Sequence, residues 1–501
     1  MIAKETEEYM RGIIGLDIGT THIKSILFSP QGEVIREEKN PTPIRSDAYG
    51  SVYDPLEIWQ IVEGQLKKLC AHARGNVDGI SITGMAEAGL IVNAKTGREE
   101  TDILPWFETR TAALAAGIKQ QEEAEIFKTT GLRNSFKYGI YKFLWFLEHG
   151  QGDRETAVWL SMCDYIAFKL TGQFVTEPGF AARTYVFDIT KGSWDEERIE
   201  AYGLAVKNFP AVVPSGTVFG AWRWNGQDRE IPVAIAGHDH ICAAFGLLYQ
   251  NREGICDSAG TSETYVGLLK EMPKEGFDFS FGILYGPFVD GGWFYMANVP
   301  SSGHSVEWFR KKLQQNELSY EEMNHRLSEQ KKGPTGLLYF PYLTGMGSPW
   351  YEASMRGTLL GIRESDDGMT VLKAMMEGIQ YQAAWLFMLI ERAHQVKSRE
   401  LVCAGGSVNN RVLMQMKADI LNRKVRIPQA VEATLCGAAA LFYHKNAGKE
   451  AAERFLANSL RQKEVFLPDE TTAEKYDRIL NGRYLPLAEE MKKIYQKMWR
   501  E

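Results

Sequence analysis

The chain has 501 residues, of which 44% are hydrophobic and 24% charged, and its formal net charge is -7. This length exceeds what one hydrophobic core normally supports, so at least two large domains are expected. Lysine and arginine are scattered through the sequence rather than clustered. This pattern argues against a nucleic-acid partner or an anionic membrane surface, because both call for a basic face.

The six cysteines are widely separated and form no Cys-x-x-Cys pair, so neither a zinc site nor a disulfide framework is predicted. Residues 1–11 lack the apolar core of a signal peptide. The longest apolar run, Ala383–Ile390, is far shorter than the roughly 20 residues of a membrane-spanning helix. We therefore expect a cytoplasmic protein with free, buried thiols and no membrane partner.

The first half of the chain begins with a strand–turn–strand pattern. An apolar run at Ile13–Asp17 is followed by a turn at Gly19 and a second strand at His22–Phe28. A Walker loop or a dinucleotide-binding loop would instead lead into a helix. Further strands are predicted near Glu33–Glu37, at Val77–Thr83 and at Leu90–Asn93, and helices at Pro55–Ala73, Arg110–Thr129 and Ile140–Glu148. This alternation indicates an α/β protein.

A second glycine turn, Ala259–Ser262, opens the second half between strands at Ile255–Ser258 and Glu263–Leu268. The repetition suggests an internal duplication, with domains of residues 1–246 and 247–501. The later part is mainly helical by its 3.6-residue period, with helices at Met369–His394 and Arg411–Leu421 and a charged helical end from about Glu464.

The first turn has the composition of a phosphate-binding loop. Gly19 allows close backbone approach, and the amides and hydroxyls of Thr20 and Thr21 can donate to phosphate oxygens. Lys24 adds a positive charge. Asp17 is a carboxylate in an apolar strand, which is unfavourable unless it binds something such as a hydrated Mg²⁺ ion. The alternative is an ordinary hairpin whose aspartate caps its own turn.

The second turn, Ser258–Ser262, has the same small and hydroxylated composition but no acid. Taken alone, it is typical of an ordinary hairpin. Together with the first turn, it predicts two loops that close on one polyphosphate. A third glycine turn, Gly405–Gly406, leads from a strand into a helix and would let a flat ring lie against backbone, with Asn409 or Asn410 reading its polar edge. Alternatively, these glycines only permit a tight strand–helix joint.

Asp239 lies between two histidines, His238 and His240, at the end of an apolar strand. A kinase that phosphorylates an alcohol needs a carboxylate to orient the hydroxyl and accept its proton, and Asp239 is the candidate. The histidines could hydrogen-bond the substrate. Metal binding is the weaker alternative, because no third ligand has the right spacing.

In this order, the segments resemble the FGGY family of carbohydrate kinases, relatives of glycerol kinase, xylulokinase and gluconokinase in the sugar kinase/Hsp70/actin superfamily. Supporting stretches are Pro105–Arg110, Lys142–Trp145, Cys163–Ile166 with Leu170–Gly172, and Gly357–Ile362 followed by Ala374–Gly378. The resemblance implies two ribonuclease H-like domains of the actin-like ATPase fold with an active-site cleft between them. It also implies ATP and Mg²⁺ as cofactors and a homodimer or homotetramer.

The resemblance assigns roles to individual residues. Asp17 falls at the metal-associated aspartate and Asp239 at the general base. The phosphate and nucleotide positions are Thr20, Thr21, Lys24, Gly260, Thr261, Ser302, Gly303, Gly405, Gly406 and Asn410, and the substrate positions are Glu87, Trp106, Glu108, Arg110 and His240.

The chain also departs from the family pattern, at Gly139, Thr370, Ser407 and Glu108. The first three concern packing or the adenine pocket. Glu108 replaces the usual aspartate at a position where the family meets substrate, so it bears on specificity. His240 replaces the glutamine or asparagine that often follows the base.

Ala86-Glu87 stands where xylulokinase-like members usually have Met-His and glycerol kinases have Arg-Glu. A carboxylate there accepts hydrogen bonds from substrate hydroxyls and repels an anion. We therefore expect ATP-dependent phosphorylation of a primary hydroxyl of a small neutral sugar or polyol, with a xylulose-like ketose or a linear polyol favoured. The alternatives are an actin- or Hsp70-like ATPase, a catalytically silent sugar-binding regulator and, within the family, a glycerol kinase or gluconokinase.

Overall fold

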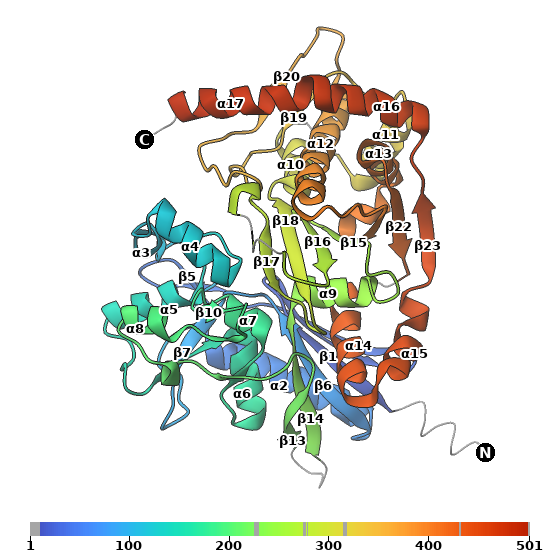
Figure 1. Cartoon of the computed structure of the whole chain (residues 1–501). Coiled ribbons are helices and arrows are strands. Elements are labelled where there is room, and N and C mark those ends of the chain that lie inside the picture. Colours follow the sequence, from blue (N-terminus) through green and yellow to red (C-terminus); the bar gives the residue numbers. More distant parts are fainter. Residues whose placement is uncertain are drawn as a thin grey trace, which may run out of the picture.

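The computed structural model describes residues 11–224, 230–273, 277, 279–313, 318–429 and 432–498. Two large mixed β-sheets, one from each half of the chain, form its framework, and helices flank them (Figure 1). The predicted α/β class is confirmed by this arrangement. Among the described residues, no helix combines the length and the apolar composition needed to cross a bilayer.

The first sheet is built on the hairpin that contains Asp17. Its strand order is β13-β14-β6-β1-β2-β3, with bounds Val218–Arg223, Glu230–His238, Val77–Gly84, Gly12–Ile18, His22–Phe28 and Val34–Pro41. Strand β1 is antiparallel to β2 and parallel to β6. Both β1 and β6 are buried at nearly every position, as expected for central strands covered on both faces.

The second sheet repeats this arrangement. Its strand order is β17-β18-β16-β15-β21-β22-β23, with bounds Leu284–Pro287, Trp293–Val299, Glu263–Leu269, Ile255–Ala259, Glu400–Ala404, Lys424–Pro428 and Gln462–Phe466. Strand β15 is antiparallel to β16 and parallel to β21. In each sheet the glycine-turn hairpin therefore has an antiparallel strand on one side, β3 or β18, and a parallel strand on the other, β6 or β21. This is the repetition that the two turns predicted.

The helices lie outside the sheets. In the first half they are α2 (Pro55–His72), α3 (Ala112–Ala115), α4 (Gln120–Thr130), α5 (Gly139–Glu148), α6 (Met162–Thr171), α7 (Pro178–Ala182), α8 (Glu196–Ala201) and α9 (Asp239–Leu247). In the second half they are α10 (Ser302–Trp308), α11 (Tyr320–Glu329), α12 (Gly368–His394), α13 (Arg411–Leu421), α14 (Ala433–Ala447), α15 (Lys449–Ser459), α16 (Glu470–Ile479) and α17 (Leu485–Met498).

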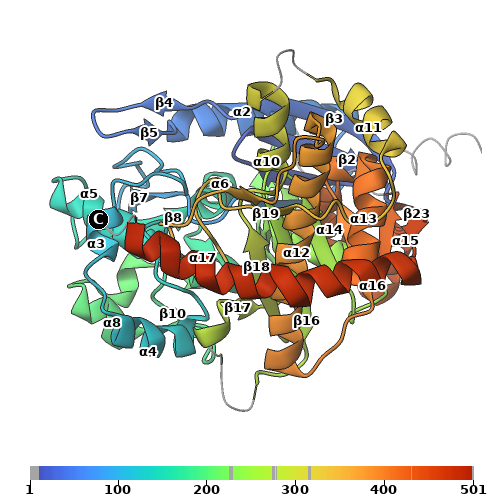
Figure 2. The same ribbon diagram turned by 90° about the horizontal axis from the view of Figure 1, so that it is seen from above.

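Two expectations from the sequence need correction. The single helix predicted over Arg110–Thr129 is divided into α3 and α4, because Gly117 interrupts it and is a poor helix former. The strand predicted at Leu90–Asn93 exists as β7 (Gly89–Asn93), but it pairs with β8 (Ala157–Ser161) in a separate two-stranded sheet. The C-terminal helices α16 and α17 form a long rod that lies across α12 (Figure 2), and Tyr484 in this rod donates a hydrogen bond to Gly378 of α12.

Helix α14 lies between β22 and β23 of the second sheet in sequence, but it packs against β1 and β6 of the first sheet and against α9 (Figure 1). Ser81 on β6 donates a hydrogen bond of 2.7 Å to the Ala438 carbonyl of α14. Where α14 crosses α9, a Cβ atom at Gly437 would lie 1.8 Å from the Cys242 carbonyl oxygen. The division into domains near residue 247 stays a prediction. Helix α14 comes after this point in the sequence but packs against elements that come before it.

We expect Gly437→Ala to lower the thermal unfolding midpoint, because the added methyl group forces α14 away from α9. Overpacking of this kind costs about 1–3 kcal/mol. Gly64→Ala in α2 is the control, since its Cβ would meet nothing within 4 Å, and removing a helical glycine stabilises by roughly 0.5–1 kcal/mol. Unchanged unfolding of Gly437→Ala would contradict the tight crossing of the two helices.

Candidate active site

The first glycine turn joins β1 to β2 and exposes its threonines. The Gly19 amide donates to the His22 carbonyl at 3.1 Å, and a Cβ at Gly19 would lie 2.9 Å from that same oxygen. Both Thr20 and Thr21 are exposed. Trp106, 41% exposed, donates from Nε1 to Thr20 Oγ1 at 3.0 Å. The indole of a predicted substrate residue thus lies directly against the first phosphate turn.

Asp17 carries a carboxylate that only the charge of Lys24 compensates in part. Its Oδ1 atom is buried and has no hydrogen-bond partner among the described residues. Burial, and after it the charges of Asp239 and Glu432, raise the pKa of Asp17 well above its usual value. A buried, unpaired carboxylate oxygen near a second carboxylate is the donor chemistry that Mg²⁺ prefers, so the residues present fit the implied metal. Asp17 would hold this ion.

Lys24 lies opposite Asp17 in the β1–β2 pairing. Its ammonium forms a 2.6 Å salt bridge with Glu432, the residue that precedes α14, and lies 3.9 Å from Glu37. The charge of Lys24 is therefore shared with protein carboxylates. Its predicted contact with phosphate stays a prediction.

Asp239 is the first residue of α9, directly after β14. Its Oδ1 accepts hydrogen bonds from the His240 amide at 2.6 Å and from His238 Nε2 at 3.1 Å. Burial alone would raise the pKa of Asp239, but the charges of His240 and His238 and these hydrogen bonds hold it below the usual range. Asp239 is thus an ionised carboxylate, as a proton acceptor must be.

The two histidines differ in their environment. Burial lowers the pKa of His240, and the charge of Asp239 opposes that shift. His238 Nδ1 is buried without a hydrogen-bond partner among the described residues. The ligand atoms of His238, Asp239 and His240 lie within 4.8 Å of one another. The alternative of a metal site here is therefore compatible with the geometry, although the spacing in the sequence did not favour it.

Glu87 is buried with a backbone φ of 63°, a strained value for a residue other than glycine. Arg183 Nη1 lies 3.2 Å and Lys137 Nζ 3.6 Å from its Oε1. Burial opposes ionisation, but Lys137, Arg183 and His238 together lower the pKa of Glu87 to about 2. The carboxylate is therefore compensated by two cations, so the repulsion of anions predicted from Glu87 alone loses its basis.

Arg183 and Lys137 are functional candidates that the sequence did not reveal. Arg183 caps the C-terminal end of α7 and is 5% exposed, and its Nη2 atom is buried without a partner among the described residues. An unused guanidinium donor beside a carboxylate is suited to a substrate hydroxyl. No local motif marks Arg183, which lies far from Glu87 in sequence and meets it only in the fold.

Glu108 and Arg110 are occupied by protein contacts. Glu108 accepts from the Ser51 amide at 2.6 Å, and Arg110 bonds both carboxylate oxygens of Asp47 at 2.7 and 2.9 Å. The guanidinium of Arg110 also lies 4.8 Å from the Trp145 ring centroid. These contacts hold the β4–β5 hairpin (Arg45–Ser46 and Ser51–Val52). Direct contact of either residue with substrate stays a prediction.

A cavity of about 720 Å³ contains the second glycine turn. Its wall includes the predicted residues Gly260, Thr261, Ser302, Gly303, Gly406 and Asn410, and the apolar side chains of Val306, Met376, Ile379 and Leu413. Its size and mixed lining suit a nucleotide. Asn324, also in the wall, has a buried Oδ1 without a partner among the described residues.

Glycines in this region are required by close contacts. The Gly303 amide donates to the Gly260 carbonyl at 3.2 Å, and a Cβ at Gly303 would lie 2.3 Å from that oxygen. Gly405 has φ of +105°, and its Cβ would lie 2.6 Å from the Ala259 carbonyl. Gly405 therefore packs against the second turn. The Asn410 side chain caps α13, because its Oδ1 accepts a hydrogen bond from the Leu413 amide at 3.0 Å. The proposed contact of Asn410 with a base would therefore use the side-chain nitrogen, Nδ2.

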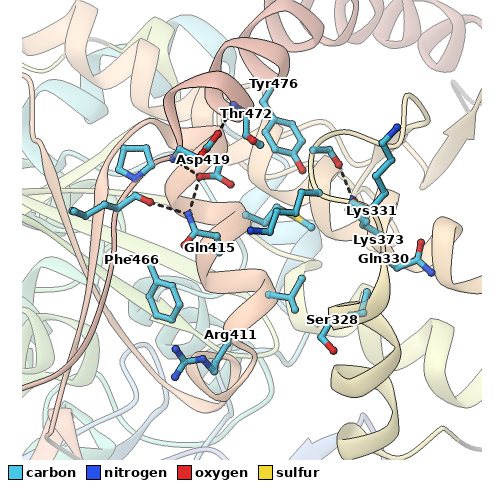
Figure 3. A pocket seen from close by; sticks show the side chains of 18 residues that line it. Ser328, Gln330, Lys331, Lys373, Arg411, Gln415, Asp419, Phe466, Thr472 and Tyr476 are labelled. Carbon is cyan, nitrogen blue, oxygen red and sulfur yellow. Dashed lines mark hydrogen bonds between the residues drawn. The ribbon is translucent and has the colours of Figure 1, made fainter.

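A separate cavity of about 580 Å³ lies beside α13 and β23 (Figure 3). Its polar groups are engaged with protein: Gln415 donates to Asp419 at 2.9 Å and to the Leu467 carbonyl at 2.8 Å, and Lys373 donates to two backbone carbonyls. None of the residues predicted for the active site lines this cavity. This cavity is therefore separate from the candidate active site around Asp17, Asp239 and the second glycine turn.

Comparisons with known proteins identify the family of the chain. Residues 12–246 match the N-terminal domain of the FGGY family of carbohydrate kinases, and residues 257–444 match its C-terminal domain. The xylulose kinase of Bacillus subtilis is 27% identical over 484 residues, which cover 94% of this chain and 96% of that protein. The glycerol kinase of Shewanella amazonensis is 29% identical over 450 residues, 86% of this chain and 89% of that protein.

Among solved structures, the gluconate kinase of Lactobacillus acidophilus superimposes with a TM-score of 0.87 at 19% identity, covering 97% of this chain and 99% of that one. With two matching domains, the chain belongs to the FGGY family of carbohydrate kinases. It is an ATP-dependent sugar or polyol kinase, and its fold is that of the actin-like ATPases.

The low pKa of Glu87 leads to a prediction about stability. A carboxyl with a pKa of about 2 when folded and roughly 4.3 when unfolded contributes stability above pH ~4.3, and this contribution is lost as the pH falls toward 2. We expect Glu87→Gln to be less stable than wild type by about 1.5–3 kcal/mol at pH 7. Denaturation series should give a difference that shrinks as the pH falls from about 4.3 toward 2. A difference as large at pH ~3 as at pH 7 would contradict the low pKa of Glu87.

Proposed function

We propose that the chain transfers the γ-phosphoryl group of ATP to a primary hydroxyl of a small sugar or polyol bound between Asp239 and Glu87. The observation that carries this proposal is the ionised Asp239, held by His238 and His240 at the start of α9. After burial, the like charge of Asp239 raises the pKa of Asp17, and the charge of Glu87 opposes the lowering of the His240 pKa by burial, so these groups lie near one another. These residues therefore form one continuous site.

In the proposed reaction, Asp239 orients the acceptor hydroxyl and takes its proton as the new phosphorus–oxygen bond forms. The exposed amides and hydroxyls of Thr20, Thr21 and Thr261 donate to phosphate oxygens from the two turns. Mg²⁺ held at Asp17 would supply charge screening for the transferred group. The apolar wall around Met376 and Ile379 binds the base, and Asn324 Oδ1 is available to a donor on its edge.

The paired charges at Glu87 support a hydroxylated substrate. A sugar hydroxyl both donates and accepts hydrogen bonds, so it can donate to the Glu87 carboxylate and accept from Arg183 Nη2. A ketose or linear polyol presents several such groups in a row. Because Lys137 and Arg183 compensate Glu87, gluconate stays a genuine alternative within the family, as does glycerol.

The direct test is ADP release from Mg-ATP with a panel of ketoses, tetritols, pentitols, glycerol and gluconate. Release should depend on one class of compound, and Asp239→Asn should reduce turnover by about 10²–10⁴-fold, as for a lost acid–base group. Asp164→Asn is the matched control, because burial raises the pKa of Asp164 to about 8 and its neutral form resembles asparagine.

Each other outcome has a defined meaning. Steady ADP release that ignores every compound and persists in Asp239→Asn would favour the alternative of an actin- or Hsp70-like ATPase. Nucleotide binding without any turnover would favour a silent sugar-binding regulator. Equal losses in Asp239→Asn and Asp164→Asn would show that the substitution acts through folding rather than through the reaction.

A second prediction concerns Arg183. Arg183→Met should raise the KM for the acceptor by about 10–100-fold, the equivalent of one charged hydrogen bond, and leave the KM for ATP near its wild-type value. Arg423→Met, which removes an arginine of similar burial from the second half of the chain, should leave the acceptor KM unchanged. An acceptor KM equal to that of wild type in Arg183→Met would exclude contact with substrate.

A further inference from the structure

Three charged side chains are buried together beneath the second glycine turn. Lys417, from the middle of α13, forms salt bridges with Asp257 Oδ2 and, at 2.5 Å, with Glu263 Oε1. The three side chains are only 0–1% exposed. None of them belongs to the proposed active site. What distinguishes them is the set of elements that they connect.

The two carboxylates bracket the turn that contains Gly260 and Thr261. Asp257 belongs to β15, which enters the turn, and Glu263 is the first residue of β16, which leaves it. In the antiparallel register Ala259 pairs with Glu263 and Asp257 with Tyr265. Because alternate residues of a strand share a face, both carboxylates point to the same side of the hairpin. Lys417 thus holds both arms of the turn.

The helix that supplies Lys417 also forms part of the nucleotide cavity. Asn410, which caps α13, and Leu413 in its first turn line that cavity together with Gly260 and Thr261. The adenosine wall and the phosphate turn are therefore parts of one unit, joined by α13 at its start and by Lys417 at its centre.

Neighbouring side chains reinforce the cluster. The Cys403 thiol on β21 donates to Asp257 Oδ2 at 3.2 Å, and the Tyr265 hydroxyl donates to Glu263 Oε2 at 2.8 Å. Strand β21 leads directly to Gly405, whose close contact with the Ala259 carbonyl was described above. Each strand around the turn thus has a polar link to the cluster.

Stability alone does not account for this arrangement. Removing charges from water costs several kcal/mol per ion, and well-packed apolar side chains in place of a buried ion cluster often give an equally or more stable protein. The cluster also leaves Asp257 Oδ1 without a hydrogen-bond partner among the described residues. In some proteins such a cluster instead fixes one relative position for the elements that it joins.

We propose that Lys417 is a positioning residue for nucleotide binding: through Asp257 and Glu263 it holds the second phosphate turn in register with the adenosine wall of α13. The inference rests on the proposed role of Gly260 and Thr261 at the nucleotide phosphates. It adds a residue that touches neither substrate nor nucleotide, and it predicts an effect on ATP that is separate from any effect on the sugar.

The test is a variant that removes all three charges at once, Asp257→Asn with Glu263→Gln and Lys417→Met, so that no ion is left unpaired. In this variant the Kd for Mg-ADP and the KM for ATP should rise by about 10–100-fold, the size of effect expected when a remote change misplaces a binding group. The KM for the acceptor should stay at its wild-type value. Lys417→Arg alone, which keeps the charge, should weaken nucleotide binding less than the triple variant does.

The matched control is Lys373→Met with Glu377→Gln, which removes another buried ion pair of the same half, 7% and 0% exposed. It should lower the thermal midpoint and leave the Kd for Mg-ADP unchanged. A folded triple variant that binds Mg-ADP as tightly as wild type would overturn the proposal. So would a control that weakens Mg-ADP binding as much as the triple variant does.

Hydrogen exchange on the unaltered protein decides the matter if the triple variant does not fold. Mg-ADP should slow exchange in residues 255–265 and, together with them, in residues 414–421 of α13. Protection confined to the turn would overturn the coupling through Lys417. Failure of wild type to bind Mg-ADP at all would instead overturn the proposed function, so the two failures are distinguishable.

Discussion

The proposed catalytic region is organised around one buried carboxylate, that of Asp17. Asp17 projects from a central strand with its Oδ1 buried and unpaired among the described residues, while Asp239 and Glu432 add further negative charge around it. In a low-dielectric setting such a group is costly unless a cation arrives. The neighbouring Lys24 is shared with Glu432 and Glu37. This arrangement is suited to the metal–nucleotide complex proposed to bind there.

The same region depends on a segment from the far end of the chain. Glu432 immediately precedes α14, which packs against β1, β6 and α9. Its close crossing with α9, at Gly437, places it beside the helix that begins at Asp239. A change in α14 can therefore alter both the electrostatics of Asp17 and the position of Asp239, the proposed base. These two carboxylates are held by residues that are hundreds of positions apart in sequence.

Compensation distinguishes the two ends of the proposed substrate site. At Asp17 negative charge is compensated only in part, by Lys24, whereas at Glu87 it is balanced by Arg183 and Lys137. The first arrangement attracts a cation with its polyphosphate, and the second offers paired donors and acceptors to hydroxyls. Between them, Asp239 stays ionised because both neighbouring histidines support its charge. One site thus serves two partners of very different polarity.

The sequence by itself determined the elements and the local chemistry. The hairpins at both glycine turns, α13 and the placement of Asp239 after a strand follow from apolar runs, turn residues and helical periodicity, all of which are short-range properties. The collinear order of the motifs also identified the family. The sequence predicted Gly303 and Gly405 as site residues but not why they are glycines. The fold gives the reason, because they contact Gly260 and Ala259 too closely for a side chain.

Only the tertiary structure decided how the charges pair. Arg183 reaches Glu87 across nearly a hundred residues, and Lys417 reaches Asp257 and Glu263 across more than a hundred and fifty. It also assigned Glu108 and Arg110 to a structural network and α14 to the first sheet. The physical reason is that the energy of a charge depends on its burial and on its nearest opposite charge. Both are set by packing between distant segments, which local sequence patterns do not carry.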